Sequence, residues 1–299
     1  MSKNILVTGG TGFVGSNIVN YFIGKTNYNI IAIDRTLKKN NQFDGVTYIE
    51  FDLKDHLNMS KLLSQYEFDY IFHQGAIVNT KYDNDDIYEI NTNAINSVIE
   101  LANKSDAKII YASSCAVYGN TTIPNKVGLQ ECPLNKYAKS KHLQDKIVLD
   151  YLSSNNGRIH ITGLRYSNVY GWGEFHKGDM SSMIYQVNSK IKNNEKIKLF
   201  EYGEQKRDFI YVDDVVEYNI NSSLSNKVGV YNAGFGNSYS FNDMMRYFDL
   251  HYKKHIDVEF VKNPYPFYQN HTLAEINNDL YLPKFNLYDG MNNYLNKLK

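Results

Sequence analysis

The stretch Ile5-Leu-Val-Thr-Gly9-Gly10-Thr-Gly12-Phe-Val-Gly15 decides the fold of this chain. A short apolar run leads into a glycine-rich turn, and an amphipathic segment follows directly. Gly10, Gly12 and Gly15 satisfy the spacing G-x-G-x-x-G, in which glycines allow a tight turn, a close approach of backbone to ligand and close packing of helix on strand. The stretch therefore predicts a strand, a turn and a helix whose first N–H groups point at phosphate.

Short β-rich runs alternate with amphipathic segments along the first half of the chain. Nearly continuous apolar runs are typical of strands that are buried on both faces of a parallel sheet. Their alternation with helical segments indicates right-handed crossovers and an α/β fold, a Rossmann-type doubly wound parallel sheet. The predicted strands are Ile5–Val7, Ile30–Ile33, Tyr48–Phe51, Tyr70–Phe72 and Ile109–Ala112, and the predicted helices are Val14–Ile23, Leu57–Leu63, Ala94–Ala102 and Ala138–Leu149.

The alternation becomes less regular after about residue 167. A β-α-β pattern between residues 208 and 232 could rejoin the first sheet, and the rest indicates a smaller mixed α/β lobe. We therefore predict a dinucleotide-binding lobe formed by residues 1–166 and 208–234, and a substrate lobe formed by residues 167–207 and 235–299. Ligands of such sheets bind in the crevice at the carboxyl ends of the strands.

Composition excludes several classes of protein. The 299 residues include 32 Lys+Arg and 32 Asp+Glu, so the net charge is zero, and we expect neither nucleic acid nor a membrane surface as partner. Hydrophobic residues make up 42%, which excludes a mostly disordered chain. Cys115 and Cys132 cannot build a disulfide framework, and we expect a cytoplasmic protein. His251 and His255 lack a further ligand, so we expect no metal.

An acidic residue ends the second predicted strand. Asp34 lies 19 residues after Gly15, where a carboxylate suits the ribose hydroxyls of a bound dinucleotide. Its charge favours NAD because it would repel a 2′-phosphate, although Arg35 directly after it could attract one. Asp52, after the third strand, could cap the adenine edge or could simply be a polar strand end.

Tyr137-Ala-Lys-Ser-Lys141 places a phenol and an ammonium group on one face of a predicted helix. Tyr21 with Lys25 and Tyr202 with Lys206 have the same spacing, so spacing alone does not select a site. Tyr137 is the one that follows the fifth strand, where the crevice should open. That strand ends at Ser113 and Ser114, which brings a hydroxyl to the same place.

These residue types fit the removal of hydride from a secondary alcohol, because the hydroxyl proton must leave as well. A phenol with its ordinary pKa of about 10 is a poor base at neutral pH. Lys141 and a positively charged nicotinamide would favour the phenolate of Tyr137, and Ser114 would bind the reacting oxygen. The alternatives are a solvated helix face beside a polar strand end, or a catalytically silent NAD-binding scaffold or redox sensor.

Several motifs resemble those of the extended short-chain dehydrogenase/reductase family over nearly the whole chain. They are Thr8–Gly15, Tyr111–Gly119, Tyr137–Lys141, Leu164–Gly171 and Arg207–Val212. Within its nucleotide-sugar branch, the sequence is most similar to ADP-glycero-manno-heptose 6-epimerases. That similarity lies in Phe72–Ala76, Phe175–Met180, Leu199–Phe209 and Tyr268-Gln269.

The resemblance implies a nucleotide-diphosphate sugar as substrate, an ADP- or GDP-heptose, used in surface polysaccharide biosynthesis. It also implies a homodimer or higher homo-oligomer. The stretch Ile77–Tyr82 departs from the Ser/Thr-rich stretch of the epimerases. The product is therefore left open between a released keto sugar, as from a dehydrogenase, and an epimer.

The resemblance also assigns roles to residues. Ser114, Tyr137 and Lys141 match the catalytic trio, and Lys177 matches a second acid–base group, although a solvated loop charge is the alternative. Asn168 and Arg207 match substrate-binding positions, although Arg207 could instead pair with a neighbouring acid. The predicted cofactor contacts are Gly9, Gly12, Phe13, Val14, Gly15, Asp34, Arg35, Asp52, Leu53, Gln74, Gly75, Ala76, Asn91, Tyr137 and Lys141, and the predicted substrate contacts are Asn79, Ser114, Asn168, Lys177, Phe200, Arg207 and Tyr268.

Overall fold

A seven-stranded parallel sheet forms the centre of the computed structural model, which describes residues 2–154, 158–263, 269–276 and 279–299. The strand order is β11-β6-β5-β4-β1-β2-β3. The order reverses next to β1, which leaves a crevice at the carboxyl ends of β1 and β4. The strands are β1 (Lys3–Thr8), β2 (Tyr28–Asp34), β3 (Val46–Glu50), β4 (Tyr70–His73), β5 (Lys108–Ser114), β6 (Ile161–Tyr166) and β11 (Gly229–Ala233).

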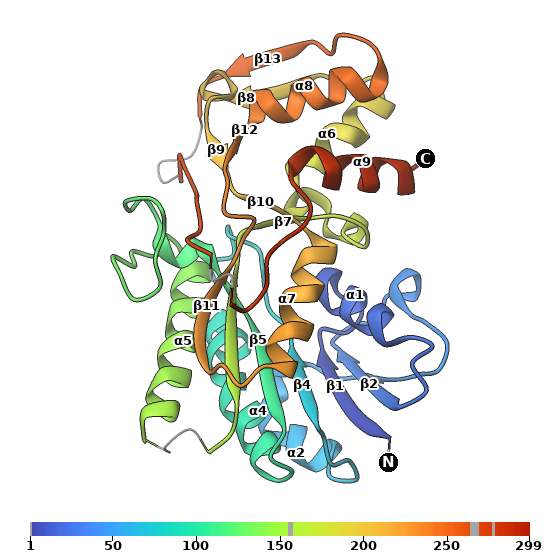
Figure 1. Ribbon diagram of the computed structural model, residues 1–299, viewed down its shortest axis with the longest axis vertical. Helices are drawn as coiled ribbons and strands as arrows, with labels where there is room; N and C mark the ends of the chain where they lie inside the picture. The colour runs from blue at the N-terminus through green and yellow to red at the C-terminus, as the bar shows by residue number, and fades with distance from the viewer. Residues whose placement is uncertain (1, 155–157, 264–268, 277–278) are drawn as a thin grey trace.

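Helices cover both faces of this sheet (Figure 1). On one face lie α1 (Phe13–Phe22) and α7 (Val212–Leu224), which contact each other. On the other lie α2 (Met59–Leu62), α4 (Ala94–Asn103) and α5 (Lys136–Ser154). The short helix α3 (Asp86–Tyr88) continues through a π-helical turn, Glu89–Asn93, into α4.

Each face of the sheet has its own apolar core because alternate side chains of a strand point to opposite faces. Leu6, Ile71 and Ile109 pack against α4 and α5, whereas Val7 and Phe72 pack against α1 and α7. Both sets are almost completely buried. This two-sided burial is the reason that the strands read as unbroken apolar runs.

Apart from β6, α7 and β11, the elements of the second half lie beyond the carboxyl ends of the sheet, toward the top of Figure 1. A third apolar cluster, which includes Tyr170, Ile184, Phe248 and Tyr294, forms their core. Their helices are α6 (Met183–Lys192), α8 (Phe241–Tyr252) and α9 (Leu287–Lys297), and their strands are β7 (Asn168–Tyr170), β8 (Ile197–Phe200), β9 (Lys206–Arg207), β10 (Phe209–Tyr211), β12 (Tyr239–Ser240) and β13 (Val258–Val261). The strands pair as β10 with β7, β12 with β9 and β13 with β8.

The predicted doubly wound parallel sheet is confirmed, and β11 rejoins it beside β6. β10 does not, because it pairs with β7 outside the sheet. The helix predicted over Leu57–Leu63 is shorter, since 3₁₀ turns over Leu53–Asn58 precede α2. The division into two lobes stays a prediction, and the separate third core is consistent with it.

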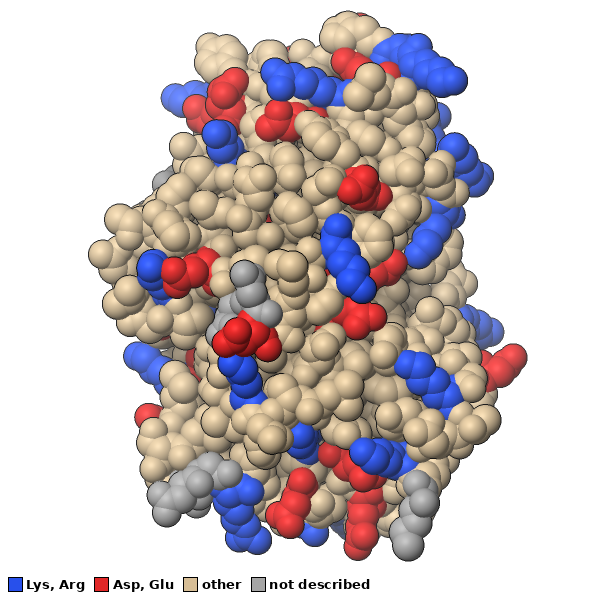
Figure 2. All heavy atoms as spheres, in the orientation of Figure 1, with Lys and Arg blue, Asp and Glu red and all other residues tan. Residues whose placement is uncertain are grey.

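The surface in Figure 2 shows acidic and basic side chains interspersed over the visible face, with no extended area of one sign. Among the residues that the structure describes, no helix is long and apolar enough to cross a membrane. Within the same residues, no group of three or more His, Cys, Asp or Glu side chains could hold a metal ion.

Substitution of Phe72 by Ala tests the core on the α1 side of the sheet. The Phe72 side chain is fully buried, and its ring centroid lies 5.8 Å from that of Phe22. Removing it should lower the free energy of unfolding by about 3–5 kcal/mol, because lost transfer energy and a cavity add. Urea unfolding followed by circular dichroism measures this. The control Leu57→Ala, at a side chain that is 79% exposed, should change stability by less than about 0.5 kcal/mol. Equal effects of the two substitutions would contradict the proposed core.

Candidate active site

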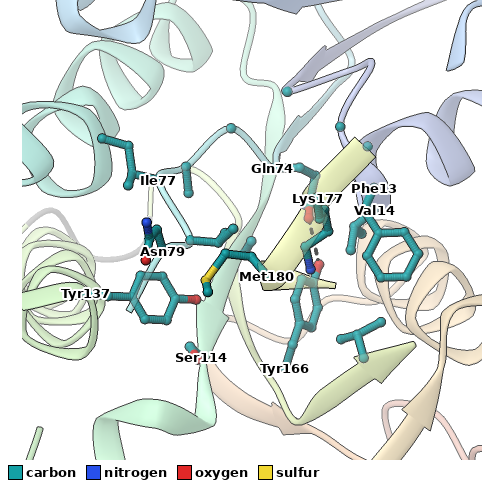
Figure 3. A pocket seen from close by; sticks show the side chains of 18 of the residues that line it. Phe13, Val14, Gln74, Ile77, Asn79, Ser114, Tyr137, Tyr166, Lys177 and Met180 are labelled. Atoms are coloured by element: carbon teal, nitrogen blue, oxygen red, sulfur yellow. Dashed lines mark hydrogen bonds between the residues drawn. The ribbon is translucent and has the colours of Figure 1, made fainter. Parts of the chain in front are cut away.

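One cavity of about 740 Å³ lies at the carboxyl ends of the strands and extends toward the second half of the chain. Its lining begins at the glycine-rich turn, includes the ends of β2, β4, β5 and β6, and reaches Lys177, Met180 and Phe241. Figure 3 shows that the Tyr137 side chain points its hydroxyl into this cavity. An elongated cavity with one end at a phosphate-binding turn and the other at a phenol suits a dinucleotide with a second ligand beside it.

The glycine-rich turn gives the cavity its backbone floor. Gly9 has a positive φ of 64°, and a Cβ at Gly15 would collide with the Gly9 carbonyl oxygen. Helix α1 therefore starts directly on the turn, with Gly12 as its N-cap and no side chain capping it. Its N-terminal N–H groups are therefore available to donate hydrogen bonds to an anion such as a pyrophosphate. Phe13 and Val14 of its first turn also line the cavity.

Asp34 lines the cavity at the end of β2, as the sequence predicts. Its Oδ2 atom accepts hydrogen bonds from the Thr11 backbone N–H (3.1 Å) and from Thr11 Oγ1 (2.9 Å). Lys38 Nζ lies 3.6 Å from the same oxygen. These contacts hold the carboxylate beside the glycine-rich turn, at the adenosine end expected for NAD. Arg35, Asp52 and Leu53 line the same end.

The segment Gln74–Ala76 after β4 forms another wall of the cavity. The Gly75 N–H donates to Thr8 Oγ1 (3.0 Å), which ties this wall to β1. Asn91 lies behind the wall rather than on it. Its Oδ1 accepts from the Ile77 N–H (2.7 Å), and its Nδ2 donates to the Ile77 carbonyl (2.8 Å). Asn91 is fully buried and does not line the cavity. Its hydrogen bonds instead fix the segment after β4 that contains Ile77.

Ser114 and Tyr137 come together although they belong to β5 and α5. A hydrogen bond with Ser114 lowers the pKa of Tyr137, while burial, the larger effect, raises that pKa. Ser114 Oγ already accepts from the Ala116 N–H (3.1 Å), so its hydroxyl proton is available to the Tyr137 oxygen. Both side chains line the cavity. In this geometry, Ser114 is the group that favours the phenolate.

Lys141 lies one helical turn after Tyr137 and is 1% exposed. Its Nζ donates to the Ala112 carbonyl (2.9 Å) and to Gln144 Oε1 (3.1 Å). Burial lowers the pKa of Lys141 to about 8. The sequence predicts that Lys141 favours the phenolate of Tyr137, and in the structure its ammonium group is held by β5 and Gln144. Lys141 still lines the cavity beside Tyr137.

Lys177 lies on the side of the cavity away from Tyr137 in Figure 3, close to Gln74 and Phe13. Burial lowers its pKa, and Glu174 acts in the opposite direction. Glu174 is fully buried and accepts from the Gly171 N–H (3.2 Å) and from Ser182 Oγ (2.7 Å). The loop that carries Lys177 is thus anchored at a carboxylate, which places a second titratable group in the cavity.

Other predicted substrate contacts divide into two groups. Asn79 and Asn168 line the cavity with Ser114 and Lys177. Phe200 and Arg207 are not among its lining residues. Arg207 is buried, donates to the carbonyls of Lys206 (2.8 Å) and Asn270 (3.2 Å), and lies 5.8 Å from the ring of Phe241, which does line the cavity. Tyr268 lies outside the described residues.

The sequence analysis missed several lining residues: Lys38, Phe51, Ile77, Val78, Tyr82, Tyr166, Ser167, Val169, His176, Met180, Met183, Phe209 and Phe241. Tyr166 is held by Gln74 Oε1 (2.8 Å) and by Asn219 Nδ2 (2.8 Å). Ser113–Ser114 and Arg165–Tyr166 are register partners at the ends of β5 and β6. The position of Tyr166 at a strand end is a signal that could have been used.

The chain belongs to the NAD dependent epimerase/dehydratase family, whose sequence profile matches residues 5–234. This membership confirms the predictions of an extended short-chain dehydrogenase/reductase, of an NAD-dependent enzyme and of NAD as its cofactor. The glycine turn and Asp34 fit that cofactor, since a side chain at Gly15 would collide with the Gly9 backbone and displace the start of α1 from the turn.

Solved structures agree with this membership. An ADP-L-glycero-D-manno-heptose-6-epimerase from Helicobacter pylori is 35% identical, with a TM-score of 0.90 over 99% of this chain and 96% of that one. A UDP-N-acetylglucosamine 4-epimerase from Methanobrevibacter ruminantium, in complex with UDP-N-acetylmuramic acid, is 28% identical, with a TM-score of 0.88 over 99% of each chain. A UDP-glucuronic acid 4-epimerase from Bacillus cereus, in complex with UDP-glucuronic acid and NAD, is 25% identical, with a TM-score of 0.84 over 99% of this chain and 100% of that one.

Substitution of Gly15 by Ala tests the glycine-rich turn. The added Cβ would meet backbone rather than a flexible side chain, so α1 must move off the turn. We expect the affinity for NAD to fall by roughly 100-fold, which corresponds to about 2.7 kcal/mol. Isothermal titration calorimetry with NAD measures this. Asn20→Ala, at an exposed position on the same helix, is the matched control and should bind like the wild type. Wild-type affinity in Gly15→Ala would refute a phosphate site at this turn.

Proposed function

We propose that this protein oxidises a hydroxyl group of a nucleotide-activated sugar, a nucleotide-diphosphate manno-heptose. The proposed substrate is an ADP- or GDP-heptose, and the proposed role is surface polysaccharide biosynthesis in the cytoplasm. The keto sugar is then either released or reduced again to an epimer. The observation that carries this proposal is the convergence of Ser114, Tyr137 and Lys141 on one cavity with the glycine-rich turn.

The proposed chemistry divides among the three side chains and a cofactor. Tyr137, as phenolate, takes the proton of the sugar hydroxyl, and Ser114 donates a hydrogen bond to the oxygen that becomes the carbonyl. NAD, when bound, supplies the hydride acceptor. Lys141 would hold the nicotinamide ribose and keep a positive charge near the phenolate. Lys141 is almost completely buried, and the exclusion of water around it strengthens its electrostatic interactions.

Lys177 is proposed as a second acid–base group, on the face of the sugar opposite Tyr137. Burial lowers its pKa, and in Figure 3 it lies across the cavity from Tyr137. An epimerase must return the hydride to the opposite face of the same carbon and a proton to the carbonyl oxygen from that side. A net dehydrogenase needs only one of these faces.

The heptose assignment rests on similarity and on the residues around the sugar end. The 35% identical Helicobacter pylori protein is a heptose epimerase by name, and this chain covers 96% of its length. Asn79 and Met180 line the cavity near Tyr137, where they would contact the sugar. We propose Asn168 for the diphosphate and Arg207 with Phe200 for the nucleotide.

A homodimer or higher homo-oligomer is part of the proposal. The helices near residues 91–104 and 137–152 would pair between subunits in a four-helix bundle. Leu143 and Leu149 on α5 are 41% and 42% exposed, which is consistent with such a surface.

Purified protein mixed with ADP- or GDP-mannoheptose tests the function directly. We expect a change in nicotinamide absorbance, a keto sugar or an epimer detected by NMR. An epimer without net change in absorbance would assign the epimerase, and a stoichiometric keto sugar would assign the dehydrogenase. No change in any of the three signals rejects the proposal.

Tyr137→Phe should lower turnover by about 10²–10⁴-fold, because the base is lost while the ring remains. Affinity for NAD should stay within about threefold of the wild type. Tyr21→Phe and Tyr202→Phe remove the phenols of the other two Tyr/Lys pairs with the same spacing and are the matched controls. Unaltered turnover in Tyr137→Phe, or an equal loss in either control, removes Tyr137 from the mechanism.

A further inference from the structure

A buried group of charges lies behind the candidate catalytic side chains. Arg165, on β6, donates from Nε to Asp145 Oδ2 (2.8 Å) and from Nη1 to Glu131 Oε1. The side chains of Arg165 and Asp145 are each 1% exposed, and that of Glu131 is 15% exposed. None of these three residues lines the cavity, so they do not touch its ligands.

Asp145 also accepts hydrogen bonds from two neutral side chains of β5. Tyr111 donates from its hydroxyl to Asp145 Oδ1 (2.9 Å), and Ser113 Oγ donates to Asp145 Oδ2 (3.0 Å). Burial and the field of Asp145 raise the pKa of Tyr111 well above its ordinary value, so this phenol stays a donor. The carboxylate is therefore held by β5 and β6 at once.

The charges of this group do not cancel among themselves. Asp145 and Glu131 contribute two carboxylates against the single guanidinium group of Arg165, and His142 Nδ1 lies 3.1 Å from Glu131 Oε2. An uncompensated buried charge is strongly unfavourable. Lys141 lies one helical turn before Asp145, and the field of Asp145 raises the pKa of Lys141. A protonated Lys141 therefore offsets part of the negative charge of this group.

We propose that Asp145 is a positioning residue that keeps Lys141 protonated and fixes helix α5 against the ends of β5 and β6. This inference rests on the proposed function for the part that Lys141 has in the chemistry. It adds a role for a residue that does not touch substrate or cofactor.

The other polar and titratable groups around Lys141 do not replace Asp145. His73, on β4, has its pKa lowered to about 3 by burial and by the field of Lys141, so it is neutral. Glu89, beside α5, is bound by His56 Nε2 (3.0 Å) and Asn93 Nδ2 (2.6 Å). Other polar and titratable groups on the packed elements include Tyr137, His142 and Gln144 of α5, Tyr111, Ser113 and Ser114 of β5, Cys115, which follows β5, and Arg165 and Tyr166 of β6.

The same contacts position the catalytic groups. The Ala112 carbonyl accepts from Lys141, and Ser113 donates to Asp145, so two consecutive residues of β5 are joined to α5. Ser114 follows directly in the chain. Its hydroxyl thus meets Tyr137 from a strand that is fixed to the helix on which Tyr137 lies.

NMR titration of the ligand-free protein with ¹³C-labelled lysine ε-carbons tests the proposal without substrate or cofactor. Loss of a resonance in Lys141→Met assigns the signal of Lys141. In the wild type it should titrate with a pKa of about 8. In Asp145→Asn, the raising field is lost, so the pKa should fall by about one unit. Tyr111→Phe removes a hydrogen bond to the same carboxylate but no charge, and should leave that pKa within about 0.3 units.

An unchanged titration of Lys141 in Asp145→Asn overturns the proposal, and so does an equal shift in Tyr111→Phe, which would indicate a purely structural role. If Asp145→Asn does not fold, Glu131→Gln removes the other negative charge that Arg165 binds. It should shift the pKa in the same direction by a smaller amount, and no shift there overturns the proposal.

The activity assay separates this inference from the proposed function. A protonated Lys141 is lost as pH rises through its pKa, so the alkaline limb of the turnover profile should move to lower pH in Asp145→Asn by the same amount as the NMR titration. A wild type that is inactive on nucleotide sugars, with the NMR shift present, rejects the function and leaves this inference standing. An active wild type with no shift in either measurement rejects this inference alone.

Discussion

The backbone contact between Gly9 and Gly15 is the constraint on which the cavity depends. With no side chain between the turn and the first turn of α1, the helix begins against the end of β1 and directs its uncapped N-terminus into the cavity. Two neighbouring walls of the cavity are fixed to the same turn and strand. Gly75 is tied to Thr8 at the end of β1, and Asp34 is tied to Thr11 within the turn.

A second constraint holds the reactive side chains at the other end of the cavity. Helix α5 carries Tyr137 and Lys141, and β5 carries Ser114, so the geometry depends on how this helix is attached to this strand. The attachment is polar and buried, through the Ala112 carbonyl and Asp145. Such contacts are worth most where water is excluded, and a missing partner there costs more than on the surface. The packing of α5 and the charge of Lys141 are thus consequences of one set of contacts.

The sequence predicted the features that depend on local pattern. Apolar runs gave the strands of the sheet, because burial on both faces leaves no polar alternation, and the glycine spacing gave the turn and the start of α1. Fourteen of the fifteen predicted cofactor contacts line the cavity, the exception being Asn91. Asn91 could not be placed from its neighbours in sequence, because its partner Ile77 lies 14 residues earlier, in the segment after β4.

Features that depend on contacts between distant parts of the chain could not be predicted from the sequence. Arg207 suits a phosphate by chemistry, yet its described hydrogen bonds go to the carbonyls of Lys206 and Asn270. Asp145 follows Lys141 by one turn, which the sequence displays, but its bond to Arg165 requires β6 to lie beside β5. Met180 and Phe241 reach the cavity from the second half of the chain, whose short strands have little periodicity.

A crystal structure of the protein with NAD and a nucleotide sugar tests the central claim most directly. The account predicts the pyrophosphate of NAD at the N-terminus of α1 and the Tyr137 oxygen within about 3 Å of a sugar hydroxyl, with the nicotinamide ring against the same carbon. A dinucleotide bound away from Gly9–Gly15, or a sugar whose hydroxyl groups are all out of reach of Tyr137, would contradict it.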